Sequence, residues 1–178
     1  MSRPLNELAR PNVIIEPLDK AHDRAAFSCG DKALDNYLKT QARQDIAKKV
    51  AVTFVLVPEG TKTIVGYYSL SSTSIRLDRL PSELAKKLPK YPDIPSTLLG
   101  RLAVDLHYRG KGYGEFLLVD ALKKSYEQSD KIGSAVILVD AKNEAAQDFY
   151  ERYGFIALPD LTGRLFLPMK TVERLFRA

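Results

Sequence analysis

Cysteine and histidine are scarce in this chain. Its 178 residues contain one cysteine, Cys29, and two histidines, His22 and His107, which lie far apart in the sequence. A single cysteine excludes an internal disulfide, and so few thiols and imidazoles leave no cluster of metal ligands. The composition therefore argues against catalysis by a metal ion or by a cysteine–histidine pair. It favours a reducing compartment, the cytoplasm.

Long apolar runs are also missing. Residues 1–12 carry charge and proline throughout, so we expect a flexible N-terminal segment and no signal peptide. No apolar stretch reaches the length of a membrane span. With 45% hydrophobic and 28% charged residues, residues 13–178 are expected to form one globular domain. The net charge of +5 favours acidic partners.

Hydrophobic periodicity predicts a mixed α/β domain. Strands are expected at 13–17, 50–57, 64–74, 98–104, 135–139, 155–158 and 164–167, with the second and third forming an antiparallel hairpin. Helical spacing runs from Ala33 to Ala42 behind a possible Asp31 cap, and a further helix is expected at 143–153, ended by Gly154. Residues 75–95 hold four prolines around a short helix, which indicates an insertion or lid rather than core.

A glycine-rich loop follows the strand predicted at 98–104 and opens a helix. A helix start leaves backbone N–H groups unpaired and carries partial positive charge, so such a loop binds phosphate. Gly110, Gly112 and Gly114 let the main chain approach a bulky anion, and Arg109 and Lys111 add charge. From these residues alone, a plain glycine turn between strand and helix remains the alternative.

The loop spacing excludes a P-loop and a Rossmann fingerprint. It resembles the R/Q-x-x-G-x-G/A pyrophosphate loop of the GCN5-related N-acetyltransferases, the GNAT family, with Arg109, Gly112 and Gly114 at the motif positions. The pattern N-x-x-A-x-x-F-Y-x-x-x-G-F, from Asn143 to Phe155, is similar to the second motif of that family. The resemblance implies a single domain with a mixed, mostly antiparallel sheet flanked by helices and with splayed central strands. It also implies acetyl-CoA as co-substrate and no metal.

The same resemblance assigns the site. The pantetheine arm would meet the backbone of the strand through Leu102, Ala103 and Val104, and Asn143 would lie beside it. The pyrophosphate would meet the loop residues Arg109, Gly110, Lys111, Gly112, Tyr113 and Gly114. Tyr150 stands where the family's general acid usually stands and would protonate the departing thiolate. A core aromatic on an amphipathic helix is the alternative for Tyr150.

The residues of the central strand bear on the acceptor. Many GNAT enzymes carry a glutamate there as a base for the amine, whereas Leu98 to Val104 contains no carboxylate. A lysine amine, with a pKa near 10.4, needs such a base more than an α-amine, whose pKa is near 8. The sequence therefore favours an α-amine acceptor, unless water or a base from another segment serves.

Further segments resemble one branch of the family, the bacterial toxins that acetylate aminoacyl-tRNA. The matching stretches are Phe27–Leu38, Gly66–Leu70 and Pro95–Asp105. The branch implies aminoacyl-tRNA as substrate, a small ribbon-helix-helix antitoxin as partner, a possible homodimer and no membrane. Two groups of basic residues are compatible with tRNA, or alternatively are solvated helix faces: Arg76, Arg79, Lys86, Lys87 and Lys90, and Lys39, Arg43, Lys48 and Lys49.

Two other functions remain open on the sequence alone. One is a GNAT enzyme that acetylates a small amine or a protein N-terminus. The other is a non-catalytic coenzyme A-binding module, which retention of Tyr150 argues against.

Overall fold

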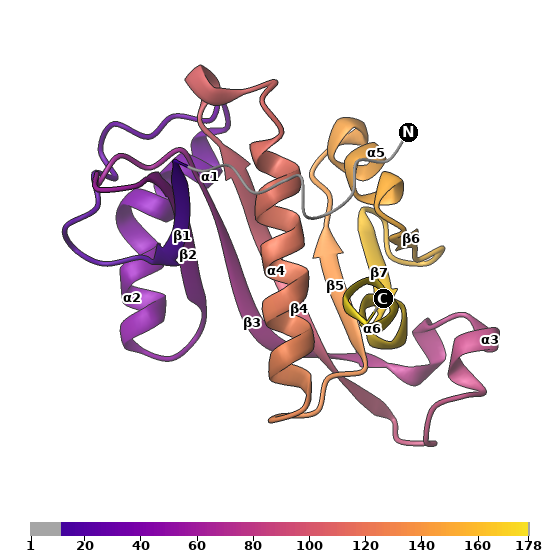
Figure 1. Ribbon diagram of the computed structural model, residues 1–178. Coiled ribbons are helices and arrows are strands. Elements are labelled where there is room, and N and C mark those ends of the chain that lie inside the picture. The colour runs from indigo at the N-terminus through magenta and orange to yellow at the C-terminus, as the bar shows by residue number, and fades with distance from the viewer. Residues whose placement is uncertain (1–11, 178) are drawn as a thin grey trace. The chain divides into compact units, whose positions relative to one another are not determined.

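The computed structural model describes residues 12–177, so the flexible segment predicted over residues 1–12 lies almost wholly outside the described residues. The described chain alternates between strands and helices (Figure 1). The strands are β1 (Val13–Pro17), β2 (Val52–Pro58), β3 (Gly66–Arg76), β4 (Asp93–Val104), β5 (Val136–Asp140), β6 (Ile156–Ala157) and β7 (Arg164–Pro168). The helices are α1 (Lys32–Asn36), α2 (Ala42–Ala47), α3 (Ser82–Ala85), α4 (Tyr113–Ser129), α5 (Glu144–Arg152) and α6 (Met169–Phe176), with a π-helical turn η2 (Tyr37–Gln41) and the 3-10 turns η3 (Leu77–Arg79) and η4 (Leu106–Tyr108).

Within the described residues the strands form one seven-stranded sheet in the order β1-β2-β3-β4-β5-β7-β6. The pairs β1–β2, β2–β3, β5–β7 and β6–β7 are antiparallel, and β4–β5 is parallel. This arrangement confirms the predicted fold class, a mixed and mostly antiparallel sheet with helices. The predicted hairpin is β2 and β3. The chain divides into two compact units, and each is described by itself below.

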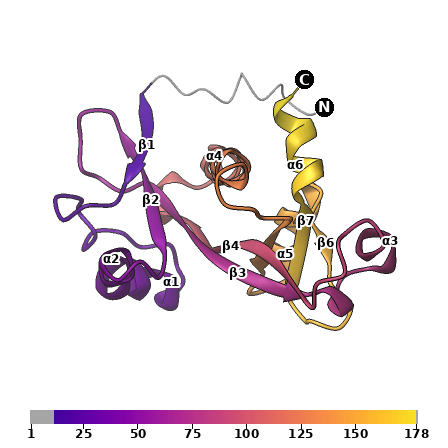
Figure 2. The ribbon, with the colours of Figure 1, turned by 90° about the horizontal axis from the view of Figure 1, so that it is seen from below.

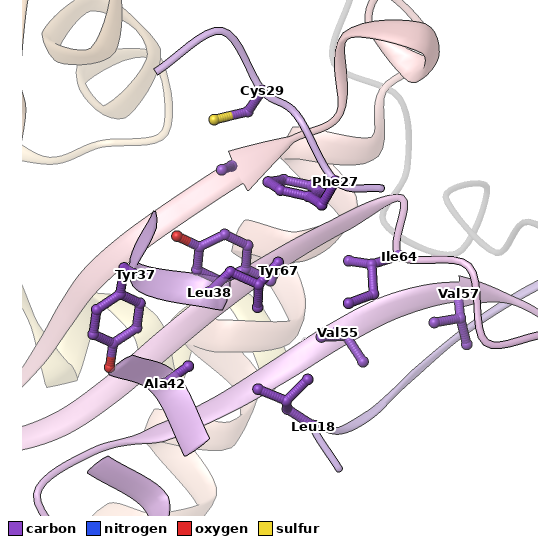
Figure 3. Close-up of a cluster of buried hydrophobic side chains, with 11 residues drawn as sticks. Leu18, Phe27, Cys29, Tyr37, Leu38, Ala42, Val55, Val57, Ile64 and Tyr67 are labelled. Atoms are coloured by element: carbon purple, nitrogen blue, oxygen red, sulfur yellow. The ribbon is translucent and has the colours of Figure 1, made fainter. Parts of the chain in front are cut away.

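The first unit comprises the described residues of Met1–Leu70 together with Arg101–Ala121. Its core holds aromatic and aliphatic side chains from β2, β3, β4, η2 and α2 and from the loops between elements, among them Phe27, Leu38 and Tyr67 (Figure 3). Gly66 lies at the tightest point of this unit. A Cβ added there would approach the Ala103 carbonyl oxygen and the Leu117 Cδ1 at 2.8 Å each, so only glycine lets these elements pack this closely.

The first helical region differs from the regular helix that its spacing predicts. Asp31 caps α1 as expected, accepting hydrogen bonds from the N–H groups of Ala33 and Leu34. The next turn is π-helical, because the Ala42 N–H bonds to the Tyr37 carbonyl five residues earlier. Leu38 and Ala42 would share a face in a regular helix as well, but the extra residue brings Tyr37 to that face, so all three side chains lie in the core.

The second unit comprises Ser71–Gly100 and the described residues of Leu122–Ala178. Its core is formed by Ile75, Leu80, Ile94, Val136, Leu138, Leu158 and Phe166. Residues 75–95 contribute the buried side chains of Ile75, Leu80 and Ile94 to this core, and Leu84 and Leu88 pack against it partly buried. The predicted role of this segment as an insertion or lid stays a prediction.

The C-terminal elements follow the prediction closely. Asn143 caps α5, and Gly154 follows the helix with a φ of +95°. The expected strands near 155–158 and 164–167 are β6 and β7, and β7 leads directly into α6 (Figure 2). Over residues 12–177 we find no helix both long and apolar enough to cross a membrane.

The parallel pairing of β4 with β5 is short. It runs from Ser96 opposite Val136 to Leu99 opposite Val139, whereas β4 continues to Val104. The paired segment therefore stops where the predicted splay of the central strands begins.

Candidate active site

The predicted anion loop is a strand–turn–helix connection in the first unit. β4 ends at Val104, Asp105 caps η4, and α4 begins at Tyr113 directly after Gly112. Gly112 has a φ of +81°, a conformation that side-chain-bearing residues rarely adopt. A Cβ built on Gly110 meets nothing within 4 Å, so the outer face of the turn is open. The first N–H groups of α4 therefore follow an open, positive-φ turn, which is the arrangement that a pyrophosphate site requires, and binding of pyrophosphate there stays a prediction.

Two residues of the first unit, Ser28 and Cys29, hold this loop in place through hydrogen bonds that we call the brace. The Asp105 carboxylate accepts a hydrogen bond of 3.0 Å from the Ser28 N–H, and the Leu106 N–H donates to the Ser28 carbonyl at 2.9 Å. The Arg109 guanidinium donates to the Cys29 carbonyl, and the Cys29 N–H donates to Asp35 of α1 at 2.9 Å. All four main-chain groups of Ser28 and Cys29 therefore tie the loop to the start of α1.

Asp105 makes one contact of this brace and further hydrogen bonds within the loop. Its buried carboxylate also accepts hydrogen bonds from the backbone N–H and from Nδ1 of His107, each at 2.9 Å. Burial by itself would raise the pKa of Asp105, but the hydrogen bonds from Ser28 and His107 outweigh it and hold that pKa below its ordinary value. The sequence analysis missed this residue, and only its place at the end of the predicted strand could have indicated it.

The two cations of the loop lie differently. The Arg109 guanidinium is engaged with Cys29, so this side chain holds the loop in shape, and its contact with pyrophosphate stays a prediction. The Lys111 ammonium lies 5.6 Å from the centroid of the Tyr108 ring, which also meets the edge of Tyr113. The buried Cys29 is a packed thiol, because burial raises its pKa to about 11.

At the end of β4, the group predicted to meet the pantetheine arm is the backbone of the strand rather than its side chains. Ala103 is buried in the core of the first unit, whereas Leu102 and Val104 are half-buried on the alternate positions of the strand. This alternation agrees with the backbone role predicted for Leu102, Ala103 and Val104, which stays a prediction.

Tyr150 lies in the second unit, on α5. Its ring packs edge-on against Phe149 and Phe155, at 5.3 and 5.5 Å between centroids, and only 6% of the residue is exposed. Burial first, and then the charge of Asp140, raise the pKa of Tyr150 above its ordinary value. The phenol is therefore protonated at neutral pH and can donate a hydrogen bond, whereas a role as a tyrosinate base is disfavoured.

Asn143 begins the same helix. Its side-chain oxygen accepts a hydrogen bond of 2.9 Å from the Ala146 N–H, so it has a capping role in this structure. Its predicted place beside the pantetheine arm stays a prediction. Nearby in the second unit, Arg164 holds Asp140 through a two-point ion pair at 2.8 and 3.0 Å.

The predicted tRNA residues of the second unit are all exposed: Arg76, Arg79, Lys86, Lys87 and Lys90. Arg76 forms a fork with Asp78, at 2.8 and 3.1 Å, and Lys86 lies 3.9 Å from Glu83. Lys90 donates to the Ala85 carbonyl at 3.1 Å. These surface contacts leave the lysines open to solvent, and binding of tRNA to them stays a prediction.

Across residues 12–177, no group of three histidine, cysteine, aspartate or glutamate side chains is placed to hold a metal ion. The strand β4 is followed by a positive-φ glycine turn and the helix α4, and β4 pairs with β5 over a short parallel segment. These features agree with the coenzyme A-dependent acyltransferase that the sequence predicts. The chain belongs to the acetyltransferase (GNAT) domain family, whose model matches residues 51–157.

Relatives within this family cover nearly the whole chain. A probable toxin TacT of Sinorhizobium fredii is 36% identical over 91% of this chain and 94% of that protein. A tRNA-acetylating toxin of Mycobacterium tuberculosis is 34% identical over 89% of this chain and 93% of that protein.

Solved structures agree with this assignment. AtaT complexed with acetyl-methionyl-tRNAfMet is 34% identical with a TM-score of 0.86, covering 93% of this chain and 99% of that one. A mutant AtaT toxin bound to the C-terminus of the antitoxin AtaR and acetyl-CoA is 29% identical with a TM-score of 0.80, covering 94% and 99%.

Proposed function

We propose that this protein transfers the acetyl group of acetyl-CoA to the α-amine of aminoacyl-tRNA and, as the toxin of a toxin–antitoxin pair, thereby blocks translation. The observation that carries the proposal is the similarity, along almost the full length, to a tRNA-acetylating toxin and to AtaT complexed with an acetylated aminoacyl-tRNA.

The coenzyme is acetyl-CoA, and the chain fits it without a metal. The turn from Arg109 to Gly112 and the N–H groups at the start of α4 receive the pyrophosphate, with Lys111 adding positive charge. The backbone of Leu102 to Val104 receives the pantetheine arm. Because Ser28 and Cys29 fix the loop from behind, it needs little ordering when the anion binds.

The acceptor is an α-amine. β4 carries no carboxylate from Ile94 to Val104, and Asp105 beyond it is occupied by the hydrogen bonds of Ser28 and His107. An α-amine with a pKa near 8 is partly neutral at pH 7, and a lysine amine is almost wholly protonated. The neutral α-amine attacks the thioester carbonyl without a strand base.

Tyr150 acts on the leaving group. When the tetrahedral intermediate collapses, the C–S bond breaks and negative charge develops on the coenzyme A sulfur. The Tyr150 hydroxyl donates a hydrogen bond to that sulfur. Because the pKa of Tyr150 is raised, full proton transfer to the thiolate costs more than the roughly 2 kcal/mol that separates an ordinary phenol from a thiol. Tyr150 therefore donates a hydrogen bond to the sulfur first, and the proton that completes the thiol comes from solvent.

Two features of the surroundings belong to the same proposal. A small antitoxin of the ribbon-helix-helix class binds the toxin, in keeping with the AtaR complex of the related AtaT. The protein acts in the cytoplasm, where charged tRNA is found. A homodimer is compatible with this function.

Mass spectrometry of the tRNA pool tests the function. Charged tRNA is incubated with the protein, with and without acetyl-CoA. Nuclease then releases the aminoacyl adenosine, and its mass is measured. We expect an acetyl-aminoacyl product that depends on acetyl-CoA. Acetylation of a free polyamine or peptide, with charged tRNA untouched, would instead assign the protein to the small-amine or N-terminal enzymes of the family. Absence of turnover with every amine would indicate a non-catalytic coenzyme A-binding module.

A further inference from the structure

Arg101 interrupts the apolar run of β4, and in the structure its guanidinium lies over an aromatic ring. Its guanidinium carbon is 3.4 Å from the centroid of the Tyr37 ring, well within cation–π range. Both residues belong to the first unit. Arg101 and Ala103 point to the same side of β4, and Ala103 and Tyr37 belong to one core cluster, which Figure 3 shows with Tyr37 labelled.

The ring beneath Arg101 is fixed in place. Tyr37 is buried, and its hydroxyl donates to Asp45 of α2 at 2.8 Å. Gln41 donates to the other oxygen of the same carboxylate at 2.9 Å. Burial, and then the hydrogen bond to Asp45, raise the pKa of Tyr37 to about 12, so the ring stays a neutral platform. The π-helical turn η2 aims it at β4.

The guanidinium itself is left with its hydrogen-bonding edge available. In the described part of the chain, Arg101 has neither a hydrogen-bond acceptor nor a carboxylate within ion-pair distance. The nearby Asp45 is occupied by Tyr37 and Gln41. The planar guanidinium of this half-buried residue is held over an aromatic ring and has N–H groups left for an acceptor, which suits a phosphate group.

This fork is too far along β4 to serve the pyrophosphate. Arg101 lies three positions before the end of the strand at Val104, which is about 10 Å at the rise of a β-strand. The pyrophosphate loop starts only beyond Asp105 and η4. The α1–η2–α2 region beneath the fork carries Lys39, Arg43, Lys48 and Lys49, which add positive potential on the same unit.

We propose that Arg101, held on Tyr37, binds a backbone phosphate near the 3′ end of the acceptor RNA and so positions the aminoacyl ester for acetylation. This inference rests on the proposed function and names the group of the substrate that one further residue recognises. Recognition of a phosphate tolerates any amino acid on the tRNA, so Arg101 contributes to affinity and position rather than to the choice of amino acid.

The test compares two acceptors that differ in phosphate. One is charged tRNA, and the other is an aminoacyl-adenosine, which offers the α-amine and the terminal nucleoside without any phosphate. Arg101→Gln is expected to lower kcat/KM for charged tRNA about 10- to 100-fold and to change kcat/KM for the nucleoside by less than about threefold. Arg101→Lys keeps the charge but not the planar stack, and should fall between wild type and Arg101→Gln.

Two further measurements guard the interpretation. In a plot of log affinity for tRNA against log salt concentration, the slope should be less steep in Arg101→Gln than in wild type by about 0.7 to 0.9, the amount expected for one phosphate contact. Lys62→Gln, which removes an exposed positive charge elsewhere in the first unit, is the matched control and should leave both acceptors as in wild type. Calorimetry should show unchanged acetyl-CoA affinity in Arg101→Gln.

The outcomes separate the possibilities. Equal losses on both acceptors with an unchanged salt slope would show that Arg101 is structural and would overturn the inference. A fall in acetyl-CoA affinity would assign the phosphate to the coenzyme, which also overturns it. Wild-type behaviour of Arg101→Gln would do the same while leaving the proposed function intact. If the wild-type protein does not acetylate charged tRNA, the proposed function fails first, and the inference fails with it.

Discussion

Replacing Asp105 with asparagine should show how far the brace behind the anion loop stabilises this fold. One carboxylate oxygen accepts both hydrogen bonds of His107, and the other accepts that of the Ser28 N–H. In Asp105→Asn the side-chain amide has only one acceptor oxygen. At least one of the two backbone N–H groups, that of Ser28 or that of His107, therefore loses its hydrogen-bond acceptor. An unsatisfied buried group costs about 1–3 kcal/mol. For a domain of this size, a loss of about 2 kcal/mol lowers Tm by roughly 4–8 °C.

The pH dependence gives a second, independent expectation. The folded-state pKa of Asp105 is lowered, so its contribution to stability is present above the ordinary aspartate pKa of about 3.9 and is lost as pH falls through the lower folded value. The stability difference between wild type and Asp105→Asn should therefore be largest at neutral pH and shrink below about pH 4.

Urea denaturation at pH 7, 5, 4 and 3.5 measures both effects, with Asp160→Asn, an exposed aspartate, as the matched control. We also expect Asp105→Asn to bind acetyl-CoA more weakly, because the loop must be ordered on binding. Equal stability of Asp105→Asn and wild type at pH 7 would refute the brace. A stability gap that stays constant down to pH 3.5 would refute its assignment to the ionised carboxylate.

Three further predictions address the site. Tyr150→Phe should lower turnover about 10²- to 10⁴-fold while acetyl-CoA affinity, by calorimetry, stays within about twofold of wild type; a near-normal rate would leave Tyr150 as a core aromatic only. Gly112→Glu should abolish acetyl-CoA binding in the same assay, because a side chain at a φ of +81° is strained and its charge repels pyrophosphate; unchanged affinity would remove the loop from the site. Reversal of the charges of Lys86, Lys87 and Lys90 should weaken tRNA acetylation without changing acetyl-CoA binding, and the difference from wild type should shrink at higher salt, because the variant makes fewer phosphate contacts. Wild-type kinetics in that triple variant would mark them as a solvated face.

The elements that the sequence predicted well are those whose signals are local. The β2–β3 hairpin shows as two apolar, β-branched runs around a turn, and α5 is bounded by its own cap Asn143 and by Gly154. Residues 75–95 were harder, because prolines and charge dominate the segment. Its buried residues are Ile75, Leu80 and Ile94, which lie far apart in the sequence, so no periodic pattern predicts their place in the core of the second unit.

The site was predictable to the same extent. The glycine turn is a local motif, and its strand–turn–helix context was confirmed. The brace was not predictable, because three of its four contacts join Ser28 and Cys29 to residues about 80 positions away. Those contacts use the main-chain groups of Ser28 and Cys29, which every residue has. The residue types at positions 28 and 29 therefore do not predict these contacts.

Arg101 shows how a missed residue follows from a local departure in structure. On β4 it shares a face with the buried Ala103, so its charge points toward the core of the first unit and needs a partner there. A regular helix through Leu34, Leu38 and Ala42 would turn Tyr37 partly away from that face, so the residue pattern does not indicate Tyr37 as the partner. The π-helical turn adds the residue that brings Tyr37 beneath the guanidinium, and π-helical turns occur frequently at functional sites. If η2 exists to build this platform, a variant that restores a regular helix by deleting Thr40 should lose the tRNA-dependent part of activity together with the stack. It should keep acetyl-CoA binding, since the brace at Ser28 and Cys29 precedes the turn.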